Sequence, residues 1–304
     1  MRIIFMGTPD FAVASLKALL NAGQNIVAVI TAPDKPAGRG QKLNESAVKK
    51  FATENNLNVL QPEKLKNPDF LQQLQGLNAD LQVVVAFRML PEAVWAMPKY
   101  GTINLHASLL PQYRGAAPIN WAIINGEKES GVTTFFLKHE IDTGDVLFSE
   151  KVVVTDDMTA GDLHDVLMET GAGLLTKTVS AIANNDYKEK SQSAFDEKEL
   201  KHAPKIFKED CKIDWNNSNE KVYNLIRGLS PYPTAYTSIL DKGLKIYKAT
   251  QEKVKPSIAP GEFESDGKTY LKFATQDGFI SVKEIQQEGK KKMLIEDFLR
   301  GVRI

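Results

Sequence analysis

The sequence predicts an α/β protein in two parts, a doubly wound and mostly parallel sheet followed by a small antiparallel β-barrel. Two observations predict this fold. Between residues 2 and 184, apolar and β-branched runs alternate with helical patterns, and repeated βα units imply a parallel sheet. From residue 207 onward, short strand patterns are separated by hairpin turns such as Asp266-Gly267 and Asp277-Gly278. We therefore expect the first part to be Rossmann-like and the second to be OB-like.

The elements of the first part follow from apolar patterns and their end signals. An apolar strand at 2–6 ends at Gly7-Thr8-Pro9, and an Ala/Leu-rich helix at 11–20 ends before Gly23. The run at 26–30 is continuously apolar, which is typical of a strand covered on both faces. The same patterns predict helices at 46–55, 69–75, 117–124 and 159–184, and strands at 58–60, 81–87, 102–106, 132–137 and 146–154.

A polar stretch separates the two parts. Residues 186–206 are rich in Lys, Glu, Ser and Asp, which makes them the best linker in the chain. We expect a first domain at 1–188, a linker at 189–206 and a C-terminal domain at 207–304, with a helix at 220–229 before its hairpins. A chain of 304 residues is long enough for two domains of ordinary size.

The composition excludes several classes of protein. Lys+Arg and Asp+Glu balance at 38 each, so the whole chain carries no nucleic-acid signature. The single cysteine, Cys211, cannot form a disulfide within the chain, and this fits a reducing cytosol. No apolar stretch is long enough to cross a membrane. We expect a cytoplasmic monomer without a membrane partner.

The most reactive segment lies between residues 101 and 145. Asn104 and His106 fall at the end of a predicted strand and, because the strand period is two, on one face of it. Asp142 lies in a glycine-containing turn further along. Asn can donate to an oxyanion, His can move a proton, and Asp can orient that His, so the set suits acyl transfer. The alternative is a pair of strand-end polar residues bonded to nearby backbone, and spacing alone does not decide whether Asp142 comes close.

Motifs of rival enzymes are missing. A glycine-rich dinucleotide fingerprint should follow the first strand, but no second glycine occurs between Gly7 and Gly23. No phosphate-binding Walker pattern occurs either. His139-Glu140 lacks the second histidine of the zinc helix motif, and we expect no metal.

Two loops have both an ordinary and a functional interpretation. Residues 108–118 form either a plain connector or, through Leu109 and Leu110 beside polar strand ends, a flat apolar ligand slot. Residues 33–43 combine Gly and Pro with Lys35, Arg39 and Lys42, which predicts a mobile basic loop. Such a loop is either a solvated surface segment or an arm that reaches phosphates or an unpaired nucleic-acid end.

The chain resembles the methionyl-tRNA formyltransferase family of folate-dependent formyltransferases nearly from end to end. The following segments carry the resemblance: Ile4-Phe5-Met6-Gly7-Thr8-Pro9-Asp10-Phe11, the loop at 33–43, Asn104-Leu105-His106-Ala107-Ser108-Leu109-Leu110-Pro111, Arg114-Gly115-Ala116-Ala117-Pro118-Ile119, Gly131-Val132-Thr133, Asp142-Thr143-Gly144-Asp145, Ile226-Arg227-Gly228-Leu229-Ser230-Pro231-Tyr232-Pro233 and Gly289-Lys290-Lys291-Lys292-Met293. The set around Asn104, His106 and Asp142 is typical of the whole superfamily, whereas the basic loop and the second domain indicate the tRNA enzymes.

The resemblance implies a reaction. The α-amino group of methionine on initiator tRNA attacks the formyl carbon of 10-formyltetrahydrofolate, which gives N-formylmethionyl-tRNA for translation initiation. It also implies that Asn104 and a charged His106 stabilise the oxyanion, while Asp142 keeps His106 charged and helps to take the amine proton. The implied folate-binding residues are Phe87, Arg88, Met89, Leu90, Ser108, Leu109, Leu110 and Pro111. Arg39, helped by Lys35 and Lys42, is implied to contact the acceptor end of the tRNA, with the C-terminal barrel holding the rest.

Two positions depart from the family pattern. Phe87-Arg88 stands where the family usually has Tyr-Gly, and Ala107 stands where it usually has Gly. Two other functions compete with tRNA formylation. One is formyl transfer to a small amine such as an amino sugar, which would have little use for Arg39. The other is an RNA-binding module whose Rossmann-like half is catalytically dead, and the intact Asn104, His106 and Asp142 argue against it.

Overall fold

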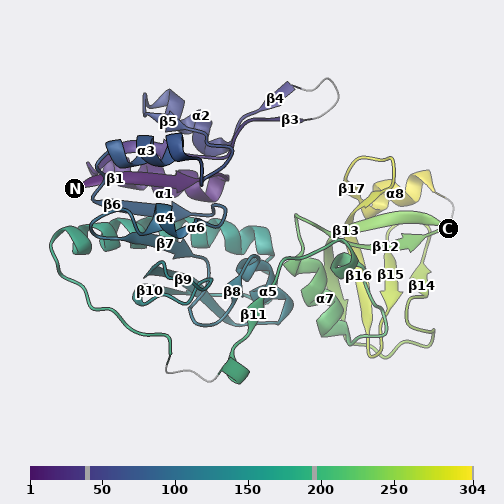
Figure 1. The fold of residues 1–304 in the computed structure, drawn as a ribbon. Coiled ribbons are helices and arrows are strands. Elements are labelled where there is room, and N and C mark those ends of the chain that lie inside the picture. The colour runs from purple at the N-terminus through teal and green to yellow at the C-terminus, as the bar shows by residue number, and fades with distance from the viewer. Residues whose placement is uncertain (38–41, 194–196, 303–304) are drawn as a thin grey trace. The chain divides into compact units, whose positions relative to one another are not determined.

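The computed structural model describes residues 1–37, 42–193 and 197–302 (Figure 1). The chain forms two compact units that do not follow chain order. The first unit comprises Met1–Gly115, Gly131–Val152 and Asp165–His202. The second comprises Ala116–Ser130, Val153–His164 and Ala203–Ile304. The boundaries at 188/189 and 206/207 stay a prediction, because the units group residues by contact and not by position along the chain.

The first unit is built on a seven-stranded sheet in the order β10-β9-β7-β6-β1-β2-β5. Strands β5, β2, β1, β6 and β7 run parallel, and β9 pairs antiparallel with β7, so the predicted doubly wound and mostly parallel sheet is confirmed. The strands are β1 (Arg2–Gly7), β2 (Asn25–Ile30), β5 (Val59–Leu60), β6 (Leu81–Val85), β7 (Thr102–His106), β9 (Glu129–Phe136) and β10 (Val146–Val153).

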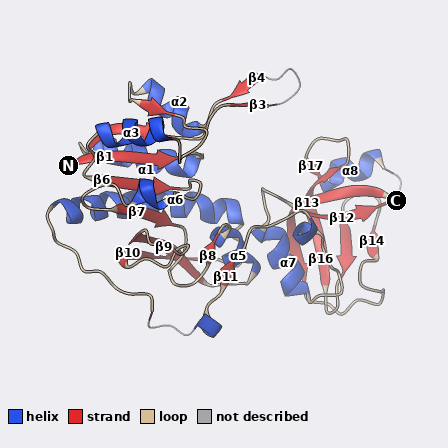
Figure 2. Cartoon of the chain, in the orientation of Figure 1, coloured by secondary structure: helices blue, strands red, loops and turns tan. Residues whose placement is uncertain are grey.

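Helices flank this sheet (Figure 2). They are α1 (Asp10–Asn21), α2 (Ala47–Glu54), α3 (Pro68–Gly76), α4 (Glu92–Trp95) and α6 (Ala160–Ala183). Phe70 and Leu74 of α3 pack with Ile4 and Met6 of β1 in one buried cluster. On α6, a Cβ at Gly171 would lie 2.9 Å from the Leu105 side chain, so α6 packs closely against β7. The core therefore fixes the strand that carries the candidate residues.

Two predicted elements differ in the structure. The predicted strand at 81–87 ends at Val85, because Ala86 has a φ of 47° and turns the chain. The predicted basic loop at 33–43 contains β3 (Lys35–Ala37) and the start of β4 (Lys42–Asn44), two short strands that pair antiparallel as a hairpin. At its base, Lys49 donates a hydrogen bond that lowers the pKa of the Asp34 carboxyl, and Gln61 donates to the same carboxylate at 2.8 Å. Glycine and proline in the sequence concealed this pairing.

The second unit contains a six-stranded antiparallel sheet, in agreement with the predicted OB-like barrel. Its strands are β12 (Ala235–Ile239), β13 (Lys242–Glu252), β14 (Phe263–Ser265), β15 (Leu271–Ala274), β16 (Phe279–Gln287) and β17 (Met293–Leu294). The helices α5 (Pro118–Ile124), α7 (Asn219–Gly228) and α8 (Ile295–Gly301) also lie in this unit. Its core includes a stacked pair, Trp215 and Phe273, with ring centroids 4.6 Å apart.

The remaining short elements are β8 (Arg114–Gly115), β11 (His202–Ala203) and two 3-10 turns, η1 (Glu197–Glu199) and η2 (Glu209–Cys211). The start of the predicted linker, before η1, belongs to the first unit, where Lys190 and Val146 form an antiparallel bridge. No helix in the described part of the chain is both long and apolar enough to cross a membrane.

Candidate active site

The carboxyl end of β7 presents two of the predicted catalytic side chains. The strand lies between β6 and β9, and Asn104 and His106 share one of its faces. The Asn104 side chain is half-buried and makes no hydrogen bond to a described residue. The N–H groups of such an amide can donate to a developing negative charge.

Each ring nitrogen of His106 faces an oxygen atom. It is 7% exposed, and its Nε2 lies 2.9 Å from the backbone oxygen of Tyr113. Because a carbonyl oxygen only accepts hydrogen bonds, Nε2 carries a proton. The other nitrogen, Nδ1, lies 3.8 Å from Oδ2 of Asp142. The fold thus brings the distant Asp142 beside His106, which sequence spacing could not decide.

The turn that carries Asp142 is fixed to the sheet. Asp142 has a φ of 55°, in the left-handed region that Asp tolerates better than most residues. Its Oδ2 accepts a hydrogen bond of 2.9 Å from the backbone N–H of Gly115. Two residues later, a Cβ at Gly144 would overlap the backbone oxygen of Phe136 on β9. The turn therefore needs glycine at this point to approach the sheet closely.

The loop of predicted folate-binding residues after β7 is anchored from β9. Thr133 is fully buried; its hydroxyl donates to the Ser108 backbone oxygen at 2.7 Å and accepts from the Leu110 backbone N–H at 3.2 Å. The Ser108 hydroxyl donates to the backbone oxygen of Gln112 at 2.6 Å. Leu109 packs against Gly131 of β9. Hydrogen bonds and packing from β9 thus fix the loop, and its role as a ligand slot stays a prediction.

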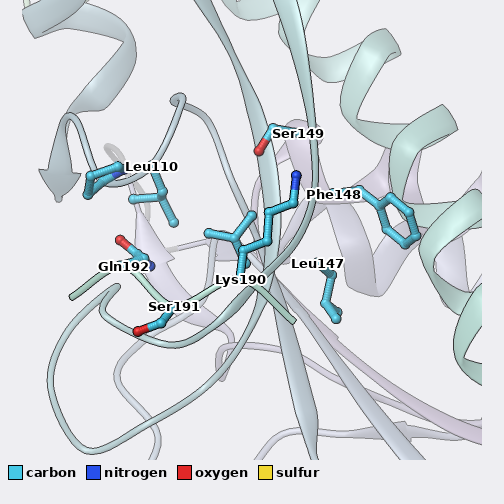
Figure 3. Close-up of a pocket in the computed structure, with 9 residues that line it drawn as sticks. Leu110, Leu147, Phe148, Ser149, Lys190, Ser191 and Gln192 are labelled. Carbon is cyan, nitrogen blue, oxygen red and sulfur yellow. The ribbon is translucent and has the colours of Figure 1, made fainter. Parts of the chain in front are cut away.

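A cavity of about 360 Å³ lies beside this loop (Figure 3). Leu110 and Gln192 lie on one side of it in the view, and Phe148 lies on the other. The lining residues are Leu110, Pro111, Val146, Leu147, Phe148, Ser149, Lys190, Ser191 and Gln192. Of the eight predicted folate-binding residues, only Leu110 and Pro111 line this cavity.

The other predicted folate-binding segment, from Phe87 to Leu90, does not line this cavity. Leu90 is buried in the core, whereas Met89 is 73% exposed. The Arg88 guanidinium donates to the backbone oxygens of Pro62 and Glu63, and it lies 5.6 Å from the Phe87 ring centroid. Partial burial lowers the pKa of Arg88. The arginine that departs from the family pattern therefore ties this segment to 62–63.

Two of the three predicted tRNA-binding residues lie on the hairpin of β3 and β4. Lys35 is exposed on β3, Lys42 belongs to β4, and Arg39 lies outside the described residues. Among described residues, no group of three or more His, Cys, Asp or Glu side chains is arranged to hold a metal ion.

Sequence reasoning missed three residues that shape the site: Tyr113, Thr133 and Gln192. Tyr113 acts through its backbone oxygen, which no side-chain pattern could indicate. Thr133 looks like an ordinary β-branched strand residue. Gln192 is buried although it lies in a polar run, and its partners are distant in sequence.

Comparison with known proteins agrees with this fold. A family model described as formyl transferase matches residues 1–179, and one described as formyl transferase, C-terminal domain matches residues 205–303. The chain is 52% identical to a methionyl-tRNA formyltransferase of Bacteroides thetaiotaomicron, over 100% of this chain and 96% of that protein. It is 51% identical to that of Bacteroides fragilis, over 99% of this chain and 95% of that protein.

Solved structures share the fold at lower identity. An N-formyltransferase from Helicobacter canadensis, solved with folinic acid and dTDP-3-aminofucose, is 23% identical with a TM-score of 0.67, and the match covers 96% of this chain and 99% of that one. HypX from Aquifex aeolicus with tetrahydrofolic acid is 20% identical, also at 0.67. The latter match covers 99% of this chain but 48% of HypX, so this chain spans about half of that protein.

Proposed function

Because this chain belongs to the methionyl-tRNA formyltransferase family, we propose that it transfers the formyl group of 10-formyltetrahydrofolate to the α-amino group of methionyl initiator tRNA. The product is N-formylmethionyl-tRNA, which serves translation initiation. The single observation that carries the chemistry is the approach of Asp142 to His106. Asn104, whose amide makes no hydrogen bond to a described residue, lies on the same strand as His106.

The three side chains divide the reaction between them. The amine nitrogen attacks the formyl carbon, a new C–N bond forms, and the carbonyl electrons move to oxygen. Asn104 donates to this oxyanion, which is the charge that develops in the transition state. His106 donates to it through Nε2–H, which gives up its hydrogen bond to the Tyr113 backbone oxygen to do so. Asp142 accepts the proton that the amine loses, directly or through a water. Collapse of the oxyanion breaks the bond to N10 of the folate, which takes up a proton and leaves as tetrahydrofolate.

Two segments carry the proposed contacts to the folate. Residues 87–90 and 108–111 follow β6 and β7, which are neighbouring parallel strands, and both segments begin at the carboxyl edge of the sheet. Ligands of doubly wound sheets bind at this edge. Exposed Met89 offers an apolar surface there, and Thr133 holds the second segment in place.

The proposed contacts to the tRNA lie on the hairpin and the second unit. Lys35 and Lys42 stand on paired strands whose base is held by Asp34, and Arg39 lies between them in the sequence. Cations of this kind bind phosphates without reading sequence. A cytosolic location belongs to the same proposal and is supported by the single cysteine, Cys211, which is buried and forms no disulfide.

The deciding experiment offers 10-formyltetrahydrofolate with methionyl initiator tRNA and, separately, with small amines including an amino sugar nucleotide. We expect formyl transfer to the tRNA alone. Mass spectrometry of the aminoacyl group measures this transfer. Transfer to a small amine, with the tRNA left unmodified, would overturn the proposal and would indicate a formyltransferase that acts on small amines. An Arg39→Ala variant should lower the tRNA-dependent rate and reduce its dependence on salt. An unchanged rate would leave the hairpin as a solvated surface segment.

A further inference from the structure

Gln192 is a buried side chain that joins two parts of the candidate site. It is 5% exposed, although its neighbours Ser191 and Ser193 are exposed. Its Nε2 donates to the backbone oxygens of Asp142, at 3.0 Å, and of Gly144, at 2.6 Å. Its Oε1 accepts from Nε and Nη2 of Arg114, at 3.1 and 2.8 Å. Both ends of the amide are therefore fully used.

The chemistry of the partners fixes how this amide points. The two backbone oxygens can only accept hydrogen bonds, and the guanidinium of Arg114 can only donate them. The side chain between them must therefore offer a donor to one side and an acceptor to the other. A glutamine does this at the observed length, whereas a glutamate would place a second acceptor against the two carbonyls.

The hydrogen bonds form a closed circuit around Asp142. Gln192 holds the Asp142 backbone, and Arg114 holds Gln192. Gly115, which follows Arg114 directly, donates its N–H to the Asp142 carboxylate at 2.9 Å. The backbone and the carboxylate of Asp142 are thus fastened to one cluster. The carboxylate lies 3.8 Å from Nδ1 of His106, so the cluster sets the distance at which the two groups meet.

We propose that Gln192, with Arg114, is a positioning residue for formyl transfer: it holds the Asp142 turn so that the carboxylate faces His106. The inference deepens the proposed function and rests on it. The hydrogen bonds of Gln192 go to Asp142, Gly144 and Arg114 and not to His106. Its effect is exerted through Asp142, and misplacing a catalytic group by about 1 Å can cost about 100-fold in rate.

The test compares Gln192→Glu and Gln192→Leu with the control Gln82→Leu. Gln82 is also a buried glutamine of the first unit, but it lies on β6 and pairs with Thr102 at the opposite end of β7. We expect both Gln192 variants to lose about 10- to 100-fold in kcat for formyl transfer to methionyl initiator tRNA, with KM for both substrates changed less than about threefold. The Gln82 control should keep its kcat, measured per folded molecule.

The Gln192→Glu variant separates positioning from stability. The introduced carboxylate would form an ion pair with Arg114 while repelling the two carbonyls, so the melting temperature of this variant should stay near that of the wild type although its kcat falls. A merely structural role would lower stability and leave kcat unchanged. Equal kcat values in both Gln192 variants and the control would overturn the inference.

A second readout does not depend on activity. Hydrogen exchange of the backbone amides at 142–146 should become faster in Gln192→Leu than in Gln82→Leu, because the turn loses two hydrogen bonds. Unchanged protection there would also overturn the inference. If the wild type transferred no formyl group to the tRNA, the proposed function would fail, and the exchange result would still decide whether Gln192 holds the turn.

Discussion

Gln192 in the first unit and Arg227 in the second use the same structural device for different ends. Each is a buried polar side chain, 5% and 4% exposed, that donates to two backbone oxygens. Gln192 holds the turn at 142–144, and Arg227 holds Thr155 and Met158, with the closer bond at 2.9 Å. Gln192 is neutral, whereas Arg227 buries a cation whose pKa is lowered by burial. The two loops differ in the side chains they carry. The turn held by Gln192 carries Asp142, a candidate catalytic residue, so holding this turn in place can affect the reaction.

The largest effect is expected at the reactive side chain itself. Asp142→Asn keeps the shape of the turn but removes the group that accepts the amine proton, so kcat should fall by about 1,000-fold. Single-turnover formyl transfer and tRNA binding, measured separately, check this. Asp80→Asn, at the opposite end of the sheet, is the matched control. A large loss of tRNA affinity in Asp142→Asn would make Asp142 a binding residue. The loop held by Gln192 would then carry no catalytic side chain, like the loop held by Arg227.

Asn104→Ala should come next. Loss of one oxyanion donor costs about 100-fold in kcat. Because the Asn104 amide has no hydrogen bond to a described residue, the free energy of unfolding should change by less than about 0.5 kcal/mol. Asn67→Ala is the converse control, because Asn67 caps α3 through the Asp69 N–H, and it should lose about 1 kcal/mol of stability at unchanged kcat. Equal behaviour of the two variants would argue against an oxyanion role for Asn104.

Arg227→Met should affect folding and not chemistry. The substitution removes the Arg227 donor from the Met158 oxygen and the Asn224 amide oxygen, and one of two donors from the Thr155 oxygen, at a cost of about 1–3 kcal/mol. Denaturant unfolding measures the loss, and kcat per folded molecule should stay unchanged. Arg300→Met, which removes an exposed ion pair with Asp297, should be nearly neutral. A reduced kcat in Arg227→Met would mean that the second unit, too, positions reacting groups.

The smallest effect concerns acid stability of the second unit. Hydrogen bonds from Thr269 and Lys268 hold the pKa of the Asp266 carboxyl well below its usual value. Its stabilising contribution is therefore complete above the unfolded pKa of about 3.9 and is lost as the pH falls toward the folded value. Asp266→Asn should lower the melting temperature slightly at pH 7, and its difference from the wild type should shrink below about pH 4.

The parts of the site that lie on strands could be predicted, because strand geometry is periodic. Asn104 and His106 alternate with apolar residues, so a shared face and a position at the carboxyl end followed from the pattern. The parallel sheet of the first unit and the antiparallel sheet of the second likewise followed from apolar runs and turn residues.

Contacts between distant segments could not be predicted. Gln192 bonds to residues 48 and 50 positions earlier, and its partners are backbone groups that every residue carries. The meeting of Asp142 and His106 depends on how β9 returns beside β7, which local patterns do not encode. The β3–β4 hairpin was obscured because its Gly and Pro residues favour an open loop.

Gly144 lets the turn that carries Asp142 lie directly against strand β9. Because nothing larger than a hydrogen fits between this residue and the Phe136 backbone oxygen, the turn rests directly on a sheet strand. The turn that carries Asp142 therefore contacts the backbone of the central sheet at Gly144, with no side chain between the two. The carboxylate is then tied to a sheet strand, although the residue itself belongs to a turn.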